Sequence, residues 1–245
     1  MSENEEFDLF GDLSPKEQAI SADVLRKLCN TRQLPVSPNN SLSDQRVRYL
    51  QSDRKANNAI GEYATLRSAQ PMNFGLVFTA HERQSIIESV YSHVRDKGWT
   101  AQRHGAFPTR DIPVKDISVS EMVYDRLATS LFPSLQQHTG IDVKYWTFRD
   151  LFVIEYHEHH QRALELHSDG CLASLTLLLN DTSEFGGGGT FFEKFNLHIE
   201  QNPGDAWIHD GKLRHSGVEI SRGQRLVMVA FMDTVGGHTN MLSQK

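Results

Sequence analysis

The feature that most constrains the fold is a change of period near Lys144. From there on, short runs of β-branched and aromatic residues are separated by Gly, Asn, Asp and Pro. The clearest runs read YWTFRDLFVIEY, LASLTLLLN, GTFFEKFNLHIE, DAWIHD and QRLVMVAFM. Short strands divided by turn residues are typical of antiparallel sandwiches and jelly rolls. The sequence therefore predicts a mainly β fold with a jelly-roll, cupin-like core over residues 144–235.

Two amphipathic helices are expected before the strands. The segment 79–99 begins with a Thr-x-x-Glu capping box and repeats apolar residues at helical intervals. A second segment has the same spacing at Ser118 and Glu121, which predicts a helix from Ser118 onward. We expect both helices to pack against the sheet as a helical support over residues 78–140.

The first 60 residues are predicted to form a separate region. Residues 1–13 hold five acids and no base, which is typical of a solvated tail, and their apolar residues leave docking on a partner open. Residues 14–33 have the periodicity of a short helix, and a polar linker follows. Residues 61–245 are expected to form one domain.

Composition excludes several classes of protein. The chain has 245 residues, of which 38% are hydrophobic and 23% charged, as in ordinary globular proteins. It has no run of about 18 apolar residues, and acids stand where a secretory signal carries bases, so we expect an intracellular, cytoplasmic protein without a membrane segment. Cys29 and Cys171 lie too far apart for a zinc or disulfide framework. The net charge of −6 argues against a nucleic-acid partner.

A histidine and an aspartate stand directly before one of the most apolar predicted strands. His167 and Asp169 precede the run ASLTLLLN. Burying a charge beside a core strand is costly unless it is neutralised, so the chain either turns into solvent here or binds a cation. Taken alone, the pair fits a solvated turn as the simpler interpretation.

Two residues further along favour the cation. His215 closes a turn after a predicted strand, and two imidazoles with one carboxylate leave open positions on an octahedral iron(II) ion. Arg225 begins the next apolar strand, and its planar guanidinium pairs bidentately with a carboxylate such as that of 2-oxoglutarate. Without the three ligands, an arginine that reaches solvent at the strand end would be the simpler interpretation.

In this region the sequence resembles the 2-oxoglutarate- and iron(II)-dependent dioxygenases, most closely the catalytic domain of procollagen lysyl hydroxylases and the related prolyl 4-hydroxylases. The resemblance covers roughly the last third of the chain, and the order and spacing of its elements are specific. These elements are Tyr156, His167, Asp169, LLLN ending at Asn180, the glycine run 186–189 with Thr190 and Phe191, PGDAWIHDG, His215 and RGQR ending at Arg225.

The resemblance implies a double-stranded β-helix and a set of site residues. The implied iron ligands are His167, Asp169 and His215. Arg225 would bind the distal carboxylate of 2-oxoglutarate, and Tyr156 and Thr176 would add hydrogen bonds to it. The implied cofactors are Fe(II), 2-oxoglutarate and O2, with ascorbate as an optional addition. An arginine at position 225 is more like the lysyl hydroxylases than the collagen prolyl enzymes, which usually carry lysine.

The implied reaction is hydroxylation of a lysyl or prolyl side chain in a peptide or protein, with release of succinate and CO2. The first alternative is a dioxygenase that acts on a free amino acid or small metabolite, because the fold and the iron site do not define the substrate. A nucleic-acid demethylase is disfavoured, because that class tends to have two more widely spaced arginines after the last metal ligand, whereas Arg222 and Arg225 lie only three residues apart. A binding module without catalysis also stays open, and the oligomeric state is not indicated.

Other polar groups are interpreted as structural. HEHHQ at 157–161 fits a solvent-facing loop better than a metal site, and the glycine run 186–189 fits a turn with positive φ better than a phosphate loop. His209 and Asp210 fit a turn pair, with a contact to the site or substrate as the alternative. Glu158 or Asp210 could pair with a substrate ammonium group, although exposed acids are more often solvated surface.

Overall fold

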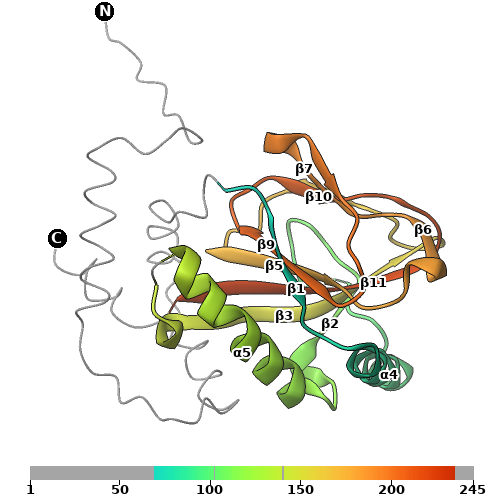
Figure 1. The fold of residues 1–245 in the computed structure, drawn as a ribbon. Helices are drawn as coiled ribbons and strands as arrows, with labels where there is room; N and C mark the ends of the chain where they lie inside the picture. Colours follow the sequence, from blue (N-terminus) through green and yellow to red (C-terminus); the bar gives the residue numbers. More distant parts are fainter. Residues whose placement is uncertain (1–68, 102, 140, 235–245) are drawn as a thin grey trace, which may run out of the picture.

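Two antiparallel sheets and two long helices form the described part of the chain (Figure 1). The computed structural model describes residues 69–101, 103–139 and 141–234, and the expected tail and short N-terminal helix lie outside these residues. The larger sheet has the strand order β1-β9-β5-β11-β3-β2, with β6 paired to β11. The smaller sheet has the order β4-β10-β7-β8. The mainly β, jelly-roll prediction is confirmed.

The bounds of the elements follow. The strands are β1 (Met72–Leu76), β2 (Asp111–Pro113), β3 (Trp146–His157), β4 (Leu164–His167), β5 (Ala173–Leu178), β6 (Phe185–Gly187), β7 (Thr190–Phe192), β8 (Leu197–Ile199), β9 (Asp205–Asp210), β10 (His215–Gly217) and β11 (Ile220–Thr234). The helices are α4 (Ala80–Lys97) and α5 (Ser120–Thr139), with 3₁₀ turns η2 (Val114–Asp116), η3 (Val143–Tyr145), η4 (Thr182–Glu184) and η5 (Glu193–Phe195). No described helix is long and apolar enough to cross a membrane.

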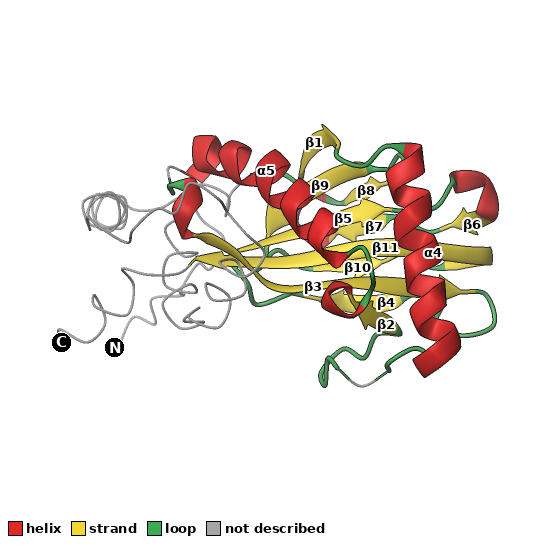
Figure 2. Cartoon of the chain, turned by 90° about the horizontal axis from the view of Figure 1, so that it is seen from below, coloured by secondary structure: helices red, strands yellow, loops and turns green. Residues whose placement is uncertain are grey.

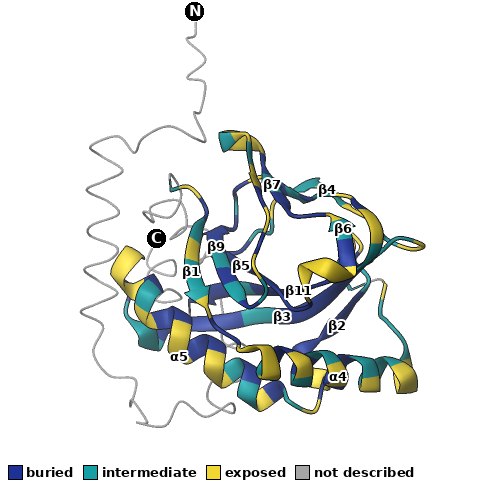
Figure 3. Ribbon diagram, turned by 45° about the vertical axis from the view of Figure 1, so that its right-hand side comes forward, coloured by how far each residue is buried: buried dark blue, intermediate teal, exposed yellow. Residues whose placement is uncertain are grey.

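Helices α4 and α5 both lie across one face of the larger sheet (Figure 2). Their exposed residues point away from the strands, which are mostly buried (Figure 3). The predicted capping box of α4 is present, with the Thr79 side chain bonded to the backbone of Glu82 and the Glu82 side chain bonded to the backbone of Thr79. The predicted start of the second helix is wrong. Helix α5 begins at Ser120, two residues later than predicted, and the Ser118 hydroxyl lies 2.7 Å from the hydroxyl of Ser89 on α4.

The central strand β5 is buried on both faces, which explains why its sequence is a nearly continuous apolar run. Successive side chains of a strand point to opposite faces. Leu175 and Leu177 pack in the core shared with the helices, whereas Thr176 lines a cavity between the two sheets. This alternation places one polar hydroxyl of an apolar strand inside the jelly roll.

A β-bulge interrupts the pairing of β3 with β11. Asp150 pairs with Phe231 and Phe148 pairs with Met232, so Arg149 is an extra residue in β3. A bulge of this kind re-aims side chains that would otherwise alternate. Phe148 and Leu151 accordingly both pack in the core beneath the helices, while Arg149 and Asp150 both line the cavity.

The short strands β1 and β2 were not predicted from the sequence. Among the described strands, β1 pairs with β9 and β2 with β3, so both stand at the ends of the strand order of the larger sheet. The β1 sequence MNFGL contains Asn and Gly, which are depleted in strands. Pairing to a neighbour distant in sequence, and not local propensity, makes these segments extended.

Candidate functional site

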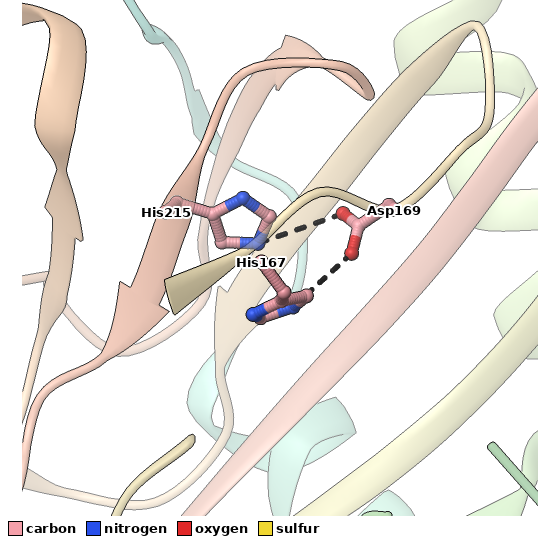
Figure 4. A group of neighbouring side chains, drawn as sticks. All are labelled: His167, Asp169 and His215. Atoms are coloured by element: carbon pink, nitrogen blue, oxygen red, sulfur yellow. Dashed lines mark ion pairs between the residues drawn. The ribbon is translucent and has the colours of Figure 1, made fainter. Parts of the chain in front are cut away.

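Two histidines and an aspartate meet where the smaller sheet borders the cavity (Figure 4). His167 ends β4, His215 begins β10, and the two are direct partners in the strand pairing. Asp169 follows β4, with one carboxylate oxygen 3.3 Å from Nε2 of His167 and the other 3.6 Å from Nε2 of His215. One ligand atom from each of the three residues lies within 4.8 Å of the others. The structure thus brings together the three residues that the sequence proposed as iron ligands.

Both imidazole rings are oriented by main-chain carbonyl groups. Nδ1 of His167 lies 2.7 Å from the carbonyl oxygen of Glu165, and Nδ1 of His215 lies 2.9 Å from that of Leu213. A carbonyl oxygen accepts hydrogen bonds, so each Nδ1 carries the proton that it donates. Nε2 of each ring therefore points into the cluster, which is the arrangement that a metal-binding histidine requires.

The electrostatics of the cluster favour a bound cation. Burial alone would raise the pKa of Asp169, but His215, the hydrogen bond with His167 and His209 together lower it, so the carboxylate is charged. Burial lowers the pKa of His215, although the charge of Asp169 opposes this shift. Oδ2 of Asp169 is buried and accepts no hydrogen bond from the described residues. A divalent ion with oxygen and nitrogen ligands would satisfy this atom, so the residues fit iron(II).

The cavity beside the cluster has a volume of about 730 Å³, within the range of roughly 300–1,000 Å³ typical of small-molecule sites. Its wall on the larger sheet runs along the ladder of β3 and β11. Tyr156 pairs with Arg225 in this ladder, and Asp150 pairs with Phe231 six residues earlier on β3, which is roughly 20 Å along a strand. The cavity therefore has two ends of different chemistry.

Arg225 marks the first end. This arginine is buried, with 2% of the residue exposed to solvent. One NH2 group donates to Oε1 of Gln201 at 3.1 Å, and the guanidinium lies over the Tyr156 ring. Among the residues that the structure describes, no carboxylate forms an ion pair with Arg225. Burial lowers the pKa of Arg225. A buried cation without an anionic partner is costly, so this end of the cavity favours a carboxylate ligand.

Gln201 belongs to this end and was missed by the sequence analysis. Its Nε2 donates to the carbonyl oxygen of Thr176 at 3.0 Å and to the Thr176 hydroxyl at 2.9 Å. The residue is buried and links Thr176 to Arg225. Its sequence context, HIEQNPGD, is that of a polar turn, and no local pattern marks Gln201 as a cavity residue.

Two glycines allow the polar groups at this end to approach the neighbouring strands. A Cβ on Gly217 would lie 2.4 Å from the Tyr156 hydroxyl oxygen. A Cβ on Gly188 would lie 3.0 Å from Cδ of Arg225, and this glycine has a φ of 84°. The predicted turn with positive φ in the glycine run is confirmed. These glycines leave room for the side chains of Arg225 and Tyr156.

Residues from the helical half close over the cluster. The Phe107 ring lies 5.0 Å from the His167 ring, centroid to centroid, and both line the cavity. The segment that carries Phe107 is held by the buried carboxylate of Asp111, which binds Arg103 at 2.6 Å and the Thr109 hydroxyl at 2.5 Å. The sequence analysis found no motif here, because these contacts depend on the tertiary fold.

The polar groups interpreted as structural have mixed outcomes. Within the described residues, HEHHQ contributes no group to a metal cluster. Asp210 caps a turn by accepting from the backbone of Lys212 at 2.8 Å, as the turn-pair interpretation expected. His209, however, is buried, and its ring lies 4.4 Å from that of His215. Burial, followed by the charge of His215, lowers the pKa of His209 to about 3. The alternative of a contact to the site therefore describes His209 better.

The acids proposed to meet a substrate ammonium group do not border the cavity. Neither Glu158 nor Asp210 lines it. The acid that does line it, besides Asp169, is Asp150. Arg103 donates to its two carboxylate oxygens at 2.8 and 2.7 Å, so Asp150 is an ion-paired rim residue.

Comparisons with known proteins agree with this site. No family model matches the chain. The chain is 28% identical to the multifunctional procollagen lysine hydroxylase and glycosyltransferase LH3 of Rattus norvegicus, over 55% of this chain and 20% of that protein. The chain thus spans about a fifth of the length of this relative.

Two solved structures illustrate the shared fold. The viral collagen prolyl hydroxylase of Paramecium bursaria Chlorella virus-1, in complex with 2-oxoglutarate, has a TM-score of 0.52 at 17% identity, over 68% of this chain and 97% of that one. The non-haem α-ketoglutarate-dependent epimerase SnoN from nogalamycin biosynthesis also has a TM-score of 0.52, at 14% identity, over 74% of this chain and 80% of that one.

The sequence match is to a hydroxylase, the solved structures that share the fold include a 2-oxoglutarate complex, and the His-Asp-His cluster could hold a metal ion, so the chain resembles one class of protein, the 2-oxoglutarate- and iron(II)-dependent oxygenases. The resemblance predicted from the sequence is thereby confirmed, as is the double-stranded β-helix that it implied. Within this class the sequence match is to a lysyl hydroxylase, and the structural matches include both protein hydroxylases and an enzyme of antibiotic biosynthesis.

Proposed function

We propose that this chain is a 2-oxoglutarate- and Fe(II)-dependent dioxygenase that hydroxylates a lysyl or prolyl side chain of a protein, with release of succinate and CO2. The observation that carries the proposal is the pairing, in one cavity, of a His-Asp-His cluster with a buried arginine that has no described carboxylate partner. The cluster suits a divalent metal, and the arginine suits the far end of a dicarboxylic acid.

His167, Asp169 and His215 would hold the metal. When bound, iron(II) supplies the activation of O2 that no side chain can provide. The protein contributes the orientation of the ligands, through the carbonyl groups of Glu165 and Leu213, and a partly apolar cavity beside them.

Arg225, Tyr156 and Thr176 would bind 2-oxoglutarate. The guanidinium of Arg225 would pair with the distal carboxylate, while its hydrogen bond to Gln201 holds the Arg225 side chain in place. Burial raises the pKa of Tyr156, although the charge of Arg225 opposes the rise, so the phenol stays protonated and can donate a hydrogen bond. The Thr176 hydroxyl already accepts from Gln201, which leaves its own proton free to donate.

The sequence match to a lysyl hydroxylase supports a protein side chain as substrate. The cavity supports a second substrate of some kind, because its volume of about 730 Å³ exceeds the needs of a five-carbon diacid alone. The alternative, a free amino acid or small metabolite, is supported by the fold shared with SnoN. Both candidate reactions use the same residues for the metal and for 2-oxoglutarate. They differ in the substrate that would occupy the part of the cavity lined by Phe107.

The test is incubation of purified protein with Fe(II), 2-oxoglutarate and O2, with and without ascorbate. Lysine- and proline-containing peptide libraries and a set of free amino acids are supplied in parallel. We expect one added oxygen on a peptide by mass spectrometry, together with one succinate per oxygen added. If free amino acids gain oxygen and every peptide stays unmodified, the small-molecule alternative replaces the proposal. If neither is modified and no succinate forms, the chain is not a dioxygenase.

A further inference from the structure

The loop that carries the metal ligand Asp169 is held from two directions. It connects β4 to β5, and its Gly170 adopts a φ of 62°. On one side, the backbone N–H groups of Asp169 and Gly170 donate to the carbonyl oxygen of Gly211, at 2.8 and 3.3 Å. On the other side lies the guanidinium of Arg149, which the β-bulge in β3 directs into the cavity.

Arg149 binds the main chain of this loop at consecutive residues. NH1 donates to the carbonyl oxygen of Gly170 at 3.0 Å, and NH2 donates to that of Asp169 at 3.3 Å. NH1 also lies 2.8 Å from a carboxylate oxygen of Asp233. The other oxygen of Asp233 accepts from the backbone N–H of Leu172 at 2.9 Å. The Arg149–Asp233 pair therefore binds the loop at both ends, at 169–170 and at 172.

We propose that Arg149 is a positioning residue for the metal ligand Asp169, with Asp233 as its anchor. This inference rests on the metal site of the proposed function and is independent of the substrate. To share a metal ion with the histidines, the Asp169 carboxylate must stay beside their Nε2 atoms. Its two oxygens lie 3.3 Å from Nε2 of His167 and 3.6 Å from Nε2 of His215. Residues that orient a metal ligand in this way typically change metal affinity 10–100-fold when they are altered, because the site is then no longer preformed.

The competing explanation is that Arg149 and Asp233 only stabilise the fold. A matched residue elsewhere in the chain separates the two explanations. Arg83 on α4 has the same side-chain exposure as Arg149, 11%, and it also joins a main-chain carbonyl, that of Leu179, to a carboxylate, that of Asp181. Arg83 does not line the cavity and has no contact with a metal ligand. Its replacement should affect stability alone.

The experiment measures binding of Mn(II) by calorimetry, without 2-oxoglutarate or substrate, alongside thermal unfolding. Arg149→Lys keeps the charge opposite Asp233 but loses the planar fork, and one ammonium group cannot reach both carbonyl oxygens and the carboxylate as the guanidinium does. We expect Mn(II) affinity to fall roughly 10–100-fold in Arg149→Lys and Arg149→Gln. Arg83→Lys should lose thermal stability while it keeps the wild-type affinity.

Two further readouts separate positioning from a loss of folding. The visible spectrum of the Co(II)-loaded protein should change in Arg149→Lys, because Asp169 then binds the metal in altered geometry, and should stay unchanged in Arg83→Lys. Asp233→Asn keeps an acceptor for Leu172 and should weaken Mn(II) binding in the same direction as Arg149→Lys. Wild-type Mn(II) affinity in folded Arg149→Lys and Asp233→Asn would overturn the proposal. A wild-type protein that binds no Mn(II) would instead overturn the metal site itself.

Discussion

The guanidinium carbon of Arg225 lies 5.4 Å from the centre of the Tyr156 ring, and the two residues are direct partners in the pairing of β11 with β3. The aromatic face and the amide of Gln201 account for the described contacts of this buried cation. Neither carries a negative charge, so an anion bound beside them would compensate the buried cation. This pair of residues therefore leads directly to a test of cosubstrate binding.

Replacing Arg225 should weaken 2-oxoglutarate binding and leave the metal in place. Removal of one partner of a buried charge pair costs about 3–5 kcal/mol, or roughly two to three and a half orders of magnitude in affinity. Arg225→Ala should raise the apparent constant for 2-oxoglutarate by this factor, and Arg225→Lys should have a milder effect. Titration of 2-oxoglutarate against the Mn(II)-loaded protein measures the affinity of both variants. Arg222→Ala, an exposed arginine on the same strand, is the control, and equal affinities in Arg225→Ala and Arg222→Ala would refute the assignment.

Each of the three cluster residues should be needed for metal binding. His167→Ala, Asp169→Ala and His215→Ala each leave two ligands, which we expect to be too few to hold a labile divalent ion. Metal analysis of the purified variants should show the loss of stoichiometric iron, and the succinate assay should show the loss of turnover. His160→Ala, at an exposed histidine of the HEHHQ segment, should retain both. A variant of the cluster that keeps full iron content would remove that residue from the site.

Gly217 should be intolerant of a side chain because of Tyr156. The Cβ of an alanine at 217 would lie 2.4 Å from the Tyr156 hydroxyl oxygen, so the ring must move. Overpacking of this kind costs about 1–3 kcal/mol, and displacement of the phenol should weaken 2-oxoglutarate binding as well. The double variant Gly217→Ala with Tyr156→Phe should recover part of the lost thermal stability, because the closest atom is gone.

Gly105→Ala provides the control for this prediction, since a Cβ at 105 meets no atom within 4 Å. Its unfolding temperature and affinity for 2-oxoglutarate should match those of the wild type. If Gly217→Ala unfolds at the same temperature as Gly105→Ala, the close contact with Tyr156 is readily relieved and the prediction is wrong.

Metal binding should raise the unfolding temperature. A ligand that binds the folded state at 100 times its dissociation constant stabilises it by about 2.7 kcal/mol. For a chain of this size, roughly 2–4 °C per kcal/mol gives a shift of about 5–10 °C. Scanning calorimetry with Mn(II) and then with excess chelator should show the shift and its reversal. The Asp169→Ala variant should show no shift, and a shift of equal size there would place the bound metal elsewhere.

The sequence by itself determined the features that depend on local spacing. Strands β3, β5, β7, β8, β9 and β11 follow from apolar runs divided by turn residues, and the start of α4 follows from its capping box. His167 and Asp169 lie two residues apart at a strand end, and Arg225 directly precedes the apolar run LVMVAFM, so each stands out against its neighbours. A polar residue in an apolar context is visible without knowledge of its tertiary contacts.

Tertiary structure alone decided which distant residues share the cavity. Gln201 lies in a polar segment whose sequence does not distinguish it from a solvent-exposed glutamine. Its role depends on the proximity of Arg225 and Thr176. The bulge that sends both Arg149 and Asp150 into the cavity breaks the alternation on which sequence analysis relies. The hydroxyl of Ser118 bonds with that of Ser89 on α4, a contact that the capping pattern of its own segment does not reveal. In each case the deciding contact joins segments far apart in the chain, and local sequence carries no signal for it.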